Sequence, residues 1–503
     1  MKAIALVNGN KRIQTTVVPI YYLNMSAFLS SNGIDNDIIE IKEYSNKVRP
    51  IDYYDNQLLK KIKQDDYEYI GISMFTNEYH YTMNLIKKIK ETFPLVKIIL
   101  GGVHPTLKPA DCFISKAPVD IVVRGEGEYP LLEILQKNPL REIKGICFKE
   151  DGEIIQTDRR SLSNDLSYLP IPAYDKIDME YYLYPTKWGL RFAVTSCIHF
   201  FTAFGCPFNC TFCATASIYK AQGGQRLVRY KSVDQVIEEI KFCKNKYDIE
   251  SCYFQDDTFT INQKRAHDIC SRLIDEKLHI TWGAETRVNC IDDELIEKMK
   301  KSGCVQLDFG VEAATDTALK RMKKGTTIKQ VEDAFDLCKR HGIRTGANFM
   351  LNTPGETQED VEELGGFMRR IDATTYLMGL TVPFIGSDIF DKYVGDLSID
   401  EYKLYENPYL FGTIIDKRFK LSAHNLPVEK YLLRLRLRFW FKKFLVDFPM
   451  KKWYLIYLIK SKYKGVIFKV LVHNMLIVTY DSFEFIVKFV LRNILNLKLF
   501  RQQ

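Results

Sequence analysis

The hydrophobic pattern of the first 140 residues predicts strands that alternate with helices. Short apolar runs are typical of buried strands, and apolar residues at three- to four-residue spacing are typical of amphipathic helices. We expect strands at 3–7, 37–41, 69–73, 97–100 and 120–123, and helices at 20–31, 55–63, 79–93 and 130–136. This alternation favours a doubly wound parallel α/β sheet, which binds ligands at the carboxyl ends of its strands.

The alternation returns after residue 190 with longer units. We expect strands at 191–196, 251–255, 279–284, 305–309, 344–350 and 376–382, and helices at 233–246, 263–276, 292–302, 328–341 and 357–370. Six strands, with helices between them, predict a partial (β/α)6 barrel with its chemistry in the loops after the strands.

Turn signals divide the chain further. Asp151-Gly152 predicts a hairpin, and Leu169-Pro170-Ile171-Pro172 predicts an extended linker. The expected domains are therefore 1–140, a hairpin and linker over 141–189, a barrel domain over 190–395, and a basic, aromatic-rich helical region over 396–503.

Composition narrows the class of protein. Hydrophobic residues make up 46% and charged residues 27% of the 503 residues, which excludes a mainly disordered chain. The opening residues do not resemble a signal peptide, and no apolar stretch of about 18 residues predicts a membrane span. We therefore expect a cytoplasmic protein, in which disulfides are rare and tightly spaced cysteines indicate a metal or catalysis.

The densest cysteine group is Cys206, Cys210 and Cys213, which follow a predicted strand on one short loop. Three thiolates at this spacing can hold three irons of a 4Fe–4S cluster and leave the fourth iron open. Zinc is the alternative, with Cys197 or His199 as the fourth ligand. The paired CxxC loops typical of zinc sites are absent, so the cluster is favoured.

This CxxxCxxC spacing, with Phe212 before the last cysteine, resembles the radical S-adenosylmethionine (SAM) enzymes. The resemblance implies that the open iron binds the amino and carboxylate groups of SAM. It also implies that an electron from a donor such as flavodoxin or ferredoxin cleaves SAM to a 5′-deoxyadenosyl radical.

The ends of the later barrel strands carry the same resemblance, which covers about residues 190–390. It implies that Asp256 and Asp257 lie where the family contacts the SAM amino group, that Arg287 belongs to the SAM site, and that Glu312 binds the ribose. The alternatives are helix capping by the two aspartates and a structural ion pair between Arg287 and Glu312.

Three segments depart from the family pattern. Ala203-Phe204-Gly205 replaces the usual Ser-Arg-Gly, and Asn352 stands where Gly is common before Thr-Pro-Gly-Glu. The stretch 197–201 resembles an insertion. These departures leave the substrate contacts more open than the cluster.

The first domain has Ser73, Gly101 and Gly102 at two predicted strand ends. In this position they resemble the Rossmann-like cobalamin-binding domain that precedes many radical SAM domains, and the resemblance implies that they bury the nucleotide tail of cobalamin. The Asp-x-His-x-x-Gly motif that ligates cobalt is absent, so we expect a corrin without a histidine ligand. His104 is assigned to the tail pocket rather than to the cobalt.

These features predict a cobalamin-dependent radical SAM enzyme that methylates an unactivated carbon of a small-molecule or lipid-like substrate. In this reaction the 5′-deoxyadenosyl radical removes a hydrogen and methylcobalamin supplies the methyl group. The first alternative is an oxidative cyclase or other radical rearrangement of a tetrapyrrole-like or lipid substrate, resembling the anaerobic magnesium-protoporphyrin monoester cyclase. The second is a non-catalytic cobalamin- or redox-sensing module. A methylthiotransferase is excluded, because the first 190 residues contain only Cys112 and Cys147.

The charge is concentrated at the end of the chain. Residues 428–503 contain sixteen basic and four acidic residues, so this segment is +12 in a chain of net charge +8. With its many aromatic residues, it predicts either a helical cap on the barrel or peripheral contact with the inner membrane surface. Nucleic acid is not expected, since its binding surfaces are usually polar as well as basic.

Overall fold

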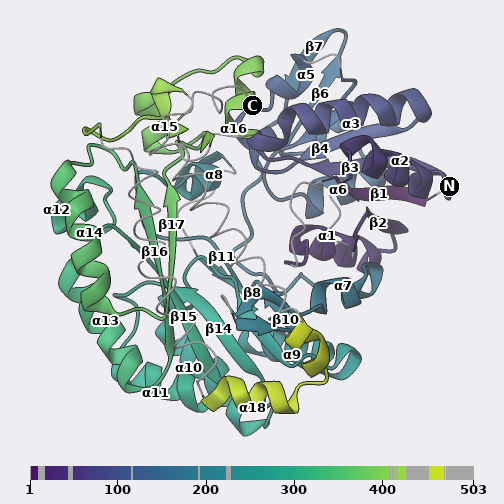
Figure 1. Ribbon diagram of the computed structural model, residues 1–503. Coiled ribbons are helices and arrows are strands. Elements are labelled where there is room, and N and C mark those ends of the chain that lie inside the picture. Colours follow the sequence, from purple (N-terminus) through teal and green to yellow (C-terminus); the bar gives the residue numbers. More distant parts are fainter. Residues whose placement is uncertain are drawn as a thin grey trace.

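The computed structural model describes residues 2–9, 17–43, 49–114, 117–190, 193–221, 228–406, 409–410, 413–414, 416–425, 452–469 and 471. Two large sheets, each accompanied by helices, lie side by side (Figure 1). The fold is α/β, as predicted.

The first sheet has the strand order β2-β1-β3-β4-β5-β6-β7. Its strands are β1 Lys2–Asn8, β2 Asn36–Glu40, β3 Tyr67–Ser73, β4 Lys97–Gly101, β5 Ile121–Val123, β6 Ile146–Glu150 and β7 Glu153–Gln156. The first five are parallel, and β6 and β7 are an antiparallel hairpin added to the edge at β5. The predicted hairpin is thus present, and it extends this sheet rather than standing apart in the linker.

Helices cover both faces of the first sheet. They are α1 Ile20–Ser31, α2 Ile51–Ile62, α3 Tyr79–Thr92, α4 Val103–Leu107, α5 Asp111–Ile114 and α6 Glu128–Leu135. Alternate residues of β1 belong to two separate clusters, Leu6 with residues of α1 and α6, and Val7 with residues of α2 and α3. This arrangement follows from the two-residue period of a strand.

The second sheet has six parallel strands in the order β10-β13-β14-β15-β16-β17. They are β10 Cys197–Phe200, β13 Ser251–Phe254, β14 Thr281–Thr286, β15 Cys304–Glu312, β16 Arg344–Leu351 and β17 Thr375–Leu380. The outer helices are α9 Val233–Tyr247, α10 Gln263–Asp275, α11 Asp293–Lys301, α13 Ile328–Arg340 and α14 Gln358–Ile371. Because β10 and β17 are the two edges, this sheet is the predicted partial (β/α)6 barrel.

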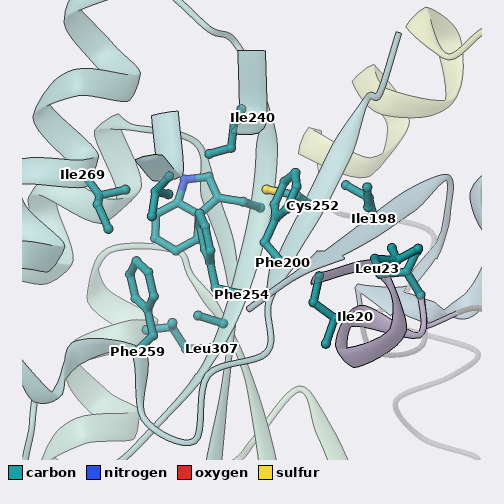
Figure 2. Packing of buried hydrophobic residues seen from close by; sticks show 14 of the residues in the cluster. Ile20, Leu23, Ile198, Phe200, Ile240, Cys252, Phe254, Phe259, Ile269 and Leu307 are labelled. Carbon is teal, nitrogen blue, oxygen red and sulfur yellow. The ribbon is translucent and has the colours of Figure 1, made fainter. Parts of the chain in front are cut away.

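The core between barrel strands and helices is continuous and apolar. Figure 2 shows Phe200, Phe254 and Leu307 packed with Ile240 and Ile269 of the outer helices. Ile20 and Leu23 of α1 belong to the same buried cluster, so the core runs on into the first domain. The boundaries that we predict at residues 140, 189 and 395 stay a prediction.

The first barrel strand differs from the prediction. Our expected strand at 191–196 overlaps a hairpin of β8 (Thr186–Leu190) and β9 (Ala193–Thr195), with 191–192 outside the described residues. The barrel begins instead at β10, within the segment that resembles an insertion. All four residues of β10 are buried, and a strand buried on both faces lacks the alternating pattern by which strands are recognised.

The described residues from 452 onward close the amino-terminal end of the barrel. Helix α18 (Lys452–Lys460, Figure 1) shares an apolar cluster with Cys197 of β10 and Tyr253 of β13. The Tyr454 hydroxyl donates to Val194 O at 3.2 Å, and Ser196 N–H donates to the Tyr457 hydroxyl at 3.1 Å. This segment is a cap on the barrel, whereas most of 428–503 lies outside the described residues. No helix in the described part of the chain is long and apolar enough to cross a membrane.

Candidate functional site

The carboxyl ends of the two sheets meet around one region. Helix α4, which follows β4, contacts α8 (Thr215–Ala221), which follows the three cysteines. The Arg229 guanidinium donates to Glu126 Oε2 at 3.0 Å, and the Tyr21 and Phe201 rings are 6.4 Å apart. The first sheet therefore presents its ligand-binding edge to the cysteine loop.

The loop with Cys206, Cys210 and Cys213 is anchored to its neighbours by backbone bonds. Thr211 N–H donates to Met322 O at 3.0 Å, and Thr211 O accepts from Ile389 N–H at 3.1 Å. All three cysteines are partly exposed, unlike the other nine, which are buried. They are thus the thiols that remain accessible to a ligand.

Positive charge lies beside this loop. The Arg287 guanidinium carbon is 3.6 Å from the centre of the Phe208 ring, and Nη1 is 3.9 Å from Cys210 Sγ. Nη2 also donates to Lys324 O, which holds the guanidinium in place. The loop therefore has a fixed cation beside one of its three thiols.

The zinc alternative does not match the geometry. Cys197 is buried in the apolar cluster under α18, and burial raises the pKa of its thiol to about 12. His199 Nδ1 is 3.1 Å from Gln255 Oε1. Among the described residues, no three His, Cys, Asp or Glu side chains converge on a single ion. A cubane does not require such convergence, because each thiolate binds a separate iron.

The two aspartates after β13 have different surroundings. Asp256 is buried, and its carboxylate accepts from Thr202 N–H at 2.6 Å, Thr202 Oγ1 at 2.5 Å and Ala203 N–H at 3.0 Å. It therefore fixes the chain that leads to the cysteines. The Asp257 side chain is exposed at the surface, but neighbouring protein groups partly desolvate its carboxylate. This desolvation, followed by the charges of Asp256 and Glu285, raises its pKa to about 6.

Glu312 lies on a β-bulge of β15 with φ of +69°. Its Oε1 is 2.8 Å from Lys324 Nζ, and both side chains are largely buried. The proposed structural ion pair between Arg287 and Glu312 is therefore wrong, since Lys324 is the partner. A non-glycine residue at positive φ is strained, which is common at functional sites. Phe212 packs nearby, against a small cluster that includes Leu319 and Met322.

Sequence reasoning missed the polar inner face of the barrel. Gln255 Oε1 is bonded to His199, and Gln255 Nε2 donates to Glu285 Oε1 at 2.9 Å. Because a carboxylate only accepts, Gln255 must present its amide nitrogen to Glu285 and its oxygen to His199, so His199 Nδ1 carries the proton. The sequence signal for this polar face is a polar residue at every second position of a buried strand.

The glycines of the first sheet lie where the sequence predicts. Ser73 and Gly101 are paired neighbours on β3 and β4, and both are partly exposed. Gly102 has φ of +102°, and a Cβ there would lie 2.6 Å from Ser73 Oγ. Gly102 is thus required for local packing, while Gly101 leaves space at the sheet edge.

His104 is unsuited to ligate cobalt from this edge. It is fully buried, its Nδ1 is 3.1 Å from Thr76 Oγ1, and its ring is packed edge-on against Tyr79 and Tyr402. Burial, and then the charge of Lys108, lowers its pKa to about 4.

Two family models match the chain. The radical SAM superfamily model matches residues 201–368, and the B12 binding domain model matches residues 12–135. An uncharacterized methyltransferase of Pyrococcus horikoshii is 32% identical over 345 residues, which is 68% of this chain and 72% of the relative. The chain belongs to the radical SAM superfamily.

Two further proteins are similar to most of this chain. This chain is 26% identical to the anaerobic magnesium-protoporphyrin IX monomethyl ester cyclase of Rubrivivax gelatinosus. The alignment covers 88% of this chain and 78% of the cyclase. The solved structure of the methyltransferase TsrM from Kitasatospora setae, with cobalamin and a [4Fe-4S] cluster bound, has a TM-score of 0.65 at 16% identity and covers 78% of each chain. At that identity the likeness concerns the fold.

The family assignment confirms the predicted cofactors. This radical SAM protein is an enzyme that uses a 4Fe–4S cluster, SAM and cobalamin. The residues fit these groups: three partly exposed thiols lie beside a guanidinium, and Gly101 opens the sheet edge that faces them.

The departure at Asn352 has a structural reason. Asn352 has φ of +58°, a conformation that asparagine tolerates better than most residues. Its Nδ2 donates to Phe419 O at 2.7 Å, and its Oδ1 accepts from Leu421 N–H at 2.9 Å. Asn352 therefore fastens the segment 419–422 over this end of the barrel.

Proposed function

We propose that this radical SAM enzyme methylates an unactivated carbon of a small molecule. The proposal rests on one observation. The cysteine loop faces the ligand-binding edge of the B12 domain, and a hydrogen bond between Arg229 and Glu126 joins the two domains. When bound, SAM at the cluster supplies the radical that removes hydrogen and cobalamin supplies the methyl group. The protein holds these groups on one substrate and excludes water.

We assign the cluster to Cys206, Cys210 and Cys213. Their exposure supports this assignment, as does the Arg287 guanidinium 3.9 Å from Cys210 Sγ. Phe212 packs the loop against the small apolar cluster near Met322 and so keeps the last cysteine in position.

For SAM, Asp257 is the better partner of the amino group, because Asp256 already accepts three bonds from residues 202 and 203. Asp256 acts as a positioning residue for the loop. Glu312 meets the ribose, held by Lys324, and Arg287 orients the cysteine loop beside it.

For cobalamin, Ser73 and Gly101 line the edge that receives the nucleotide tail. Gly102 keeps this edge open by allowing the turn after β4. The burial of His104 supports a corrin without a histidine ligand.

Oxidative cyclisation is the second candidate, because one relative is a magnesium-protoporphyrin cyclase. Product analysis of the reduced enzyme with SAM separates the two reactions. Methylation yields S-adenosylhomocysteine together with 5′-deoxyadenosine, whereas cyclisation yields 5′-deoxyadenosine without S-adenosylhomocysteine. Absence of any SAM cleavage would favour the sensing module. Reduced flavodoxin or ferredoxin is the electron donor for the assay.

We also propose that the C-terminal region contacts an anionic membrane surface. Ile459 and Phe468 are 75% and 68% exposed on the outer side of the cap, among several lysines, and residues 428–503 carry +12. Basic residues near an anionic surface contribute about 1 kcal/mol each. Full-length protein should co-sediment with phosphatidylserine vesicles at low salt and much less at high salt. Substitution of Ile459 and Phe468 by Ser should weaken this binding, and no binding at any salt concentration would exclude it.

A further inference from the structure

A basic turn, residues 319–325, is packed against the cysteine loop. Met322 O of this turn accepts from Thr211 N–H of the loop at 3.0 Å. Lys324 O of the turn accepts from the guanidinium of Arg287. The basic turn therefore contacts both the loop and the cation that lies beside one of its thiols.

Positive charge is concentrated in this turn. Four of its seven residues are basic, namely Lys320, Arg321, Lys323 and Lys324. Two of them are paired with carboxylates of the barrel, Arg321 with Asp360 and Lys324 with Glu312. Because the chain is +8 and residues 428–503 are +12, the remaining residues sum to −4. The basic turn thus contrasts in charge with the slightly acidic body to which it belongs.

The other two cations, Lys320 and Lys323, are exposed. Lys323 Nζ is 3.5 Å from the carboxylate of Asp388, and these two side chains are 61% and 55% exposed. Lys320 forms no ion pair with the described residues. An exposed ion pair contributes at most about 1 kcal/mol, so Asp388 holds Lys323 only weakly. Both ammonium groups are therefore available to an acidic partner.

A short path joins the surface of the basic turn to the thiols. Gly325, at the end of the turn, is exposed, and a Cβ there would lie 3.8 Å from Arg287 Nη2. Arg287 Nη1 is 3.9 Å from Cys210 Sγ. One side chain thus separates this surface from a cysteine of the loop.

The position of the basic turn leaves it accessible to another protein. The turn starts in α12 (Asp316–Arg321), which lies on the side of the barrel away from the first sheet (Figure 1). A partner can therefore approach this face without meeting the B12 domain.

Cleavage of SAM to the 5′-deoxyadenosyl radical requires one electron from outside the protein. We propose that the basic turn docks an acidic carrier protein with a one-electron flavin or iron–sulfur centre. The carrier loses one electron and the cluster gains it, with no atom transferred. The inference rests on the proposed assignment of the cluster to Cys206, Cys210 and Cys213.

A patch of this size is sufficient for such a partner. Encounters between redox proteins usually bury less than about 1,200 Å² and are weak. Complementary charges steer these encounters and fix their orientation. The attraction is screened over about 8 Å at physiological ionic strength, so docking through two exposed lysines should be sensitive to salt.

Equilibrium binding of oxidised flavodoxin, an acidic flavin protein, to the full-length protein tests the surface directly. The double variant Lys320→Glu with Lys323→Glu should raise the Kd by about tenfold at low salt, because like charges then face each other. The difference between variant and wild type should shrink at high salt. An unchanged Kd in the double variant would overturn the proposal.

Lys301→Glu with Lys339→Glu is the matched control, since it makes the same change in net charge. These lysines are 63% and 68% exposed, near the ends of α11 and α13 that lead into barrel strands. They are therefore at the opposite end of the barrel from the cysteine loop. The control should bind flavodoxin like the wild type, and equal weakening would show that only net charge matters and exclude a docking surface.

SAM cleavage with two reductants separates docking from a role in the cluster loop. With reduced flavodoxin, the Lys320→Glu, Lys323→Glu variant should need about ten times more flavodoxin for half its maximal rate. With dithionite, which needs no docking surface, its rate should equal that of the wild type. A lower rate with dithionite as well would assign the lysines to the loop itself and overturn the proposal. A wild-type protein without iron would contradict the cluster assignment, while flavodoxin binding would still decide the docking surface.

Phosphatidylserine vesicles are the remaining alternative occupant of the basic turn. If the double variant lost vesicle binding and kept the wild-type Kd for flavodoxin, the turn would belong to a membrane-binding surface, and the carrier protein would be excluded.

Discussion

The two ends of the barrel differ in chemistry although the same strands build both. At the carboxyl end lie the cysteine loop, Arg287, Asp257 and the buried pair Glu312–Lys324. At the amino end, β8, β9 and α18 cover an apolar cluster that includes Tyr253 and Val305. The carboxyl end, here called the open end, carries charges that lower the stability of the fold. The amino end, here called the closed end, contributes apolar packing.

Strand β10 and the two residues after it show this change. Cys197 begins the strand inside the apolar cluster under α18, and Thr202, just past its end, is bonded to the carboxylate of Asp256. Barrel enzymes place catalysis at the carboxyl face and stability at the other. The closed end therefore fixes the strands from which the polar end projects, and substitutions at the two ends should have separable effects.

The largest expected effect is loss of the cluster. Alanine at Cys206, Cys210 and Cys213 together should abolish binding of about four irons per chain and all SAM cleavage, because the iron ligands are removed. Cys243→Ala and Cys270→Ala are the controls, since both thiols are buried between helices and strands. Iron analysis after anaerobic reconstitution measures the outcome. An unchanged iron content in the triple variant would contradict the cluster assignment.

The next effect concerns the buried pair at the open end. Lys324→Met should lower the free energy of unfolding by about 3–5 kcal/mol, because it leaves the Glu312 carboxylate buried without its partner. The double variant with Glu312→Gln should recover most of this loss. Denaturant unfolding measures both, and an additive double variant would show that the two side chains are not coupled. SAM binding should be weakened in Lys324→Met, in Glu312→Gln alone and in the double variant.

The sequence predicted the strands and helices of the first sheet closely, because parallel strands and amphipathic helices have distinct periods. It also located the cysteine loop, the glycines at β4 and the family. It misplaced the first barrel strand, since Cys197–Phe200 is buried throughout and gives no alternation.

The pairing of side chains could not be predicted from the sequence, for a different reason. Lys324 and Glu312 are twelve residues apart, and only the bulge in β15 and the turn before Lys324 bring them together. The roles of Asp256 and Asp257 also separate only in three dimensions, because adjacent residues point to different surroundings. For the C-terminal region, composition alone left two predictions open, a helical cap on the barrel and contact with a membrane surface.

A smaller effect should follow from the titration of Asp257. Its pKa is about 6, so the carboxylate is neutral below this pH and cannot pair with the SAM amino group. At one pH unit below the pKa about a tenth is ionised, so SAM affinity should fall about tenfold between pH 7 and pH 5. The Asp257→Asn variant should bind SAM weakly, and its SAM affinity should no longer depend on pH in this range. Equilibrium binding of SAM to the reconstituted protein measures it, and an unchanged pH profile in the variant would exclude Asp257.

The same shift has the opposite sign for stability. Because the folded-state pKa is raised above that of the unfolded chain, the charged form of Asp257 is disfavoured in the fold. The penalty grows between about pH 4 and pH 6 and is complete above. Asp257→Asn should therefore stabilise the protein at pH 7 and change little below pH 4.

The smallest expected effect is at the closed end. Tyr457→Phe removes the hydroxyl that accepts Ser196 N–H at 3.1 Å, and the N–H then remains buried without a partner. Such a loss costs about 1–3 kcal/mol, so the Tm should fall while iron content, SAM affinity and SAM cleavage remain those of the wild type. Tyr463→Phe on the same segment is the matched control, because the Tyr463 hydroxyl forms no hydrogen bond with the described residues. If Tyr457→Phe instead reduced SAM cleavage without lowering the Tm, the separation between a structural and a chemical end of the barrel would fail.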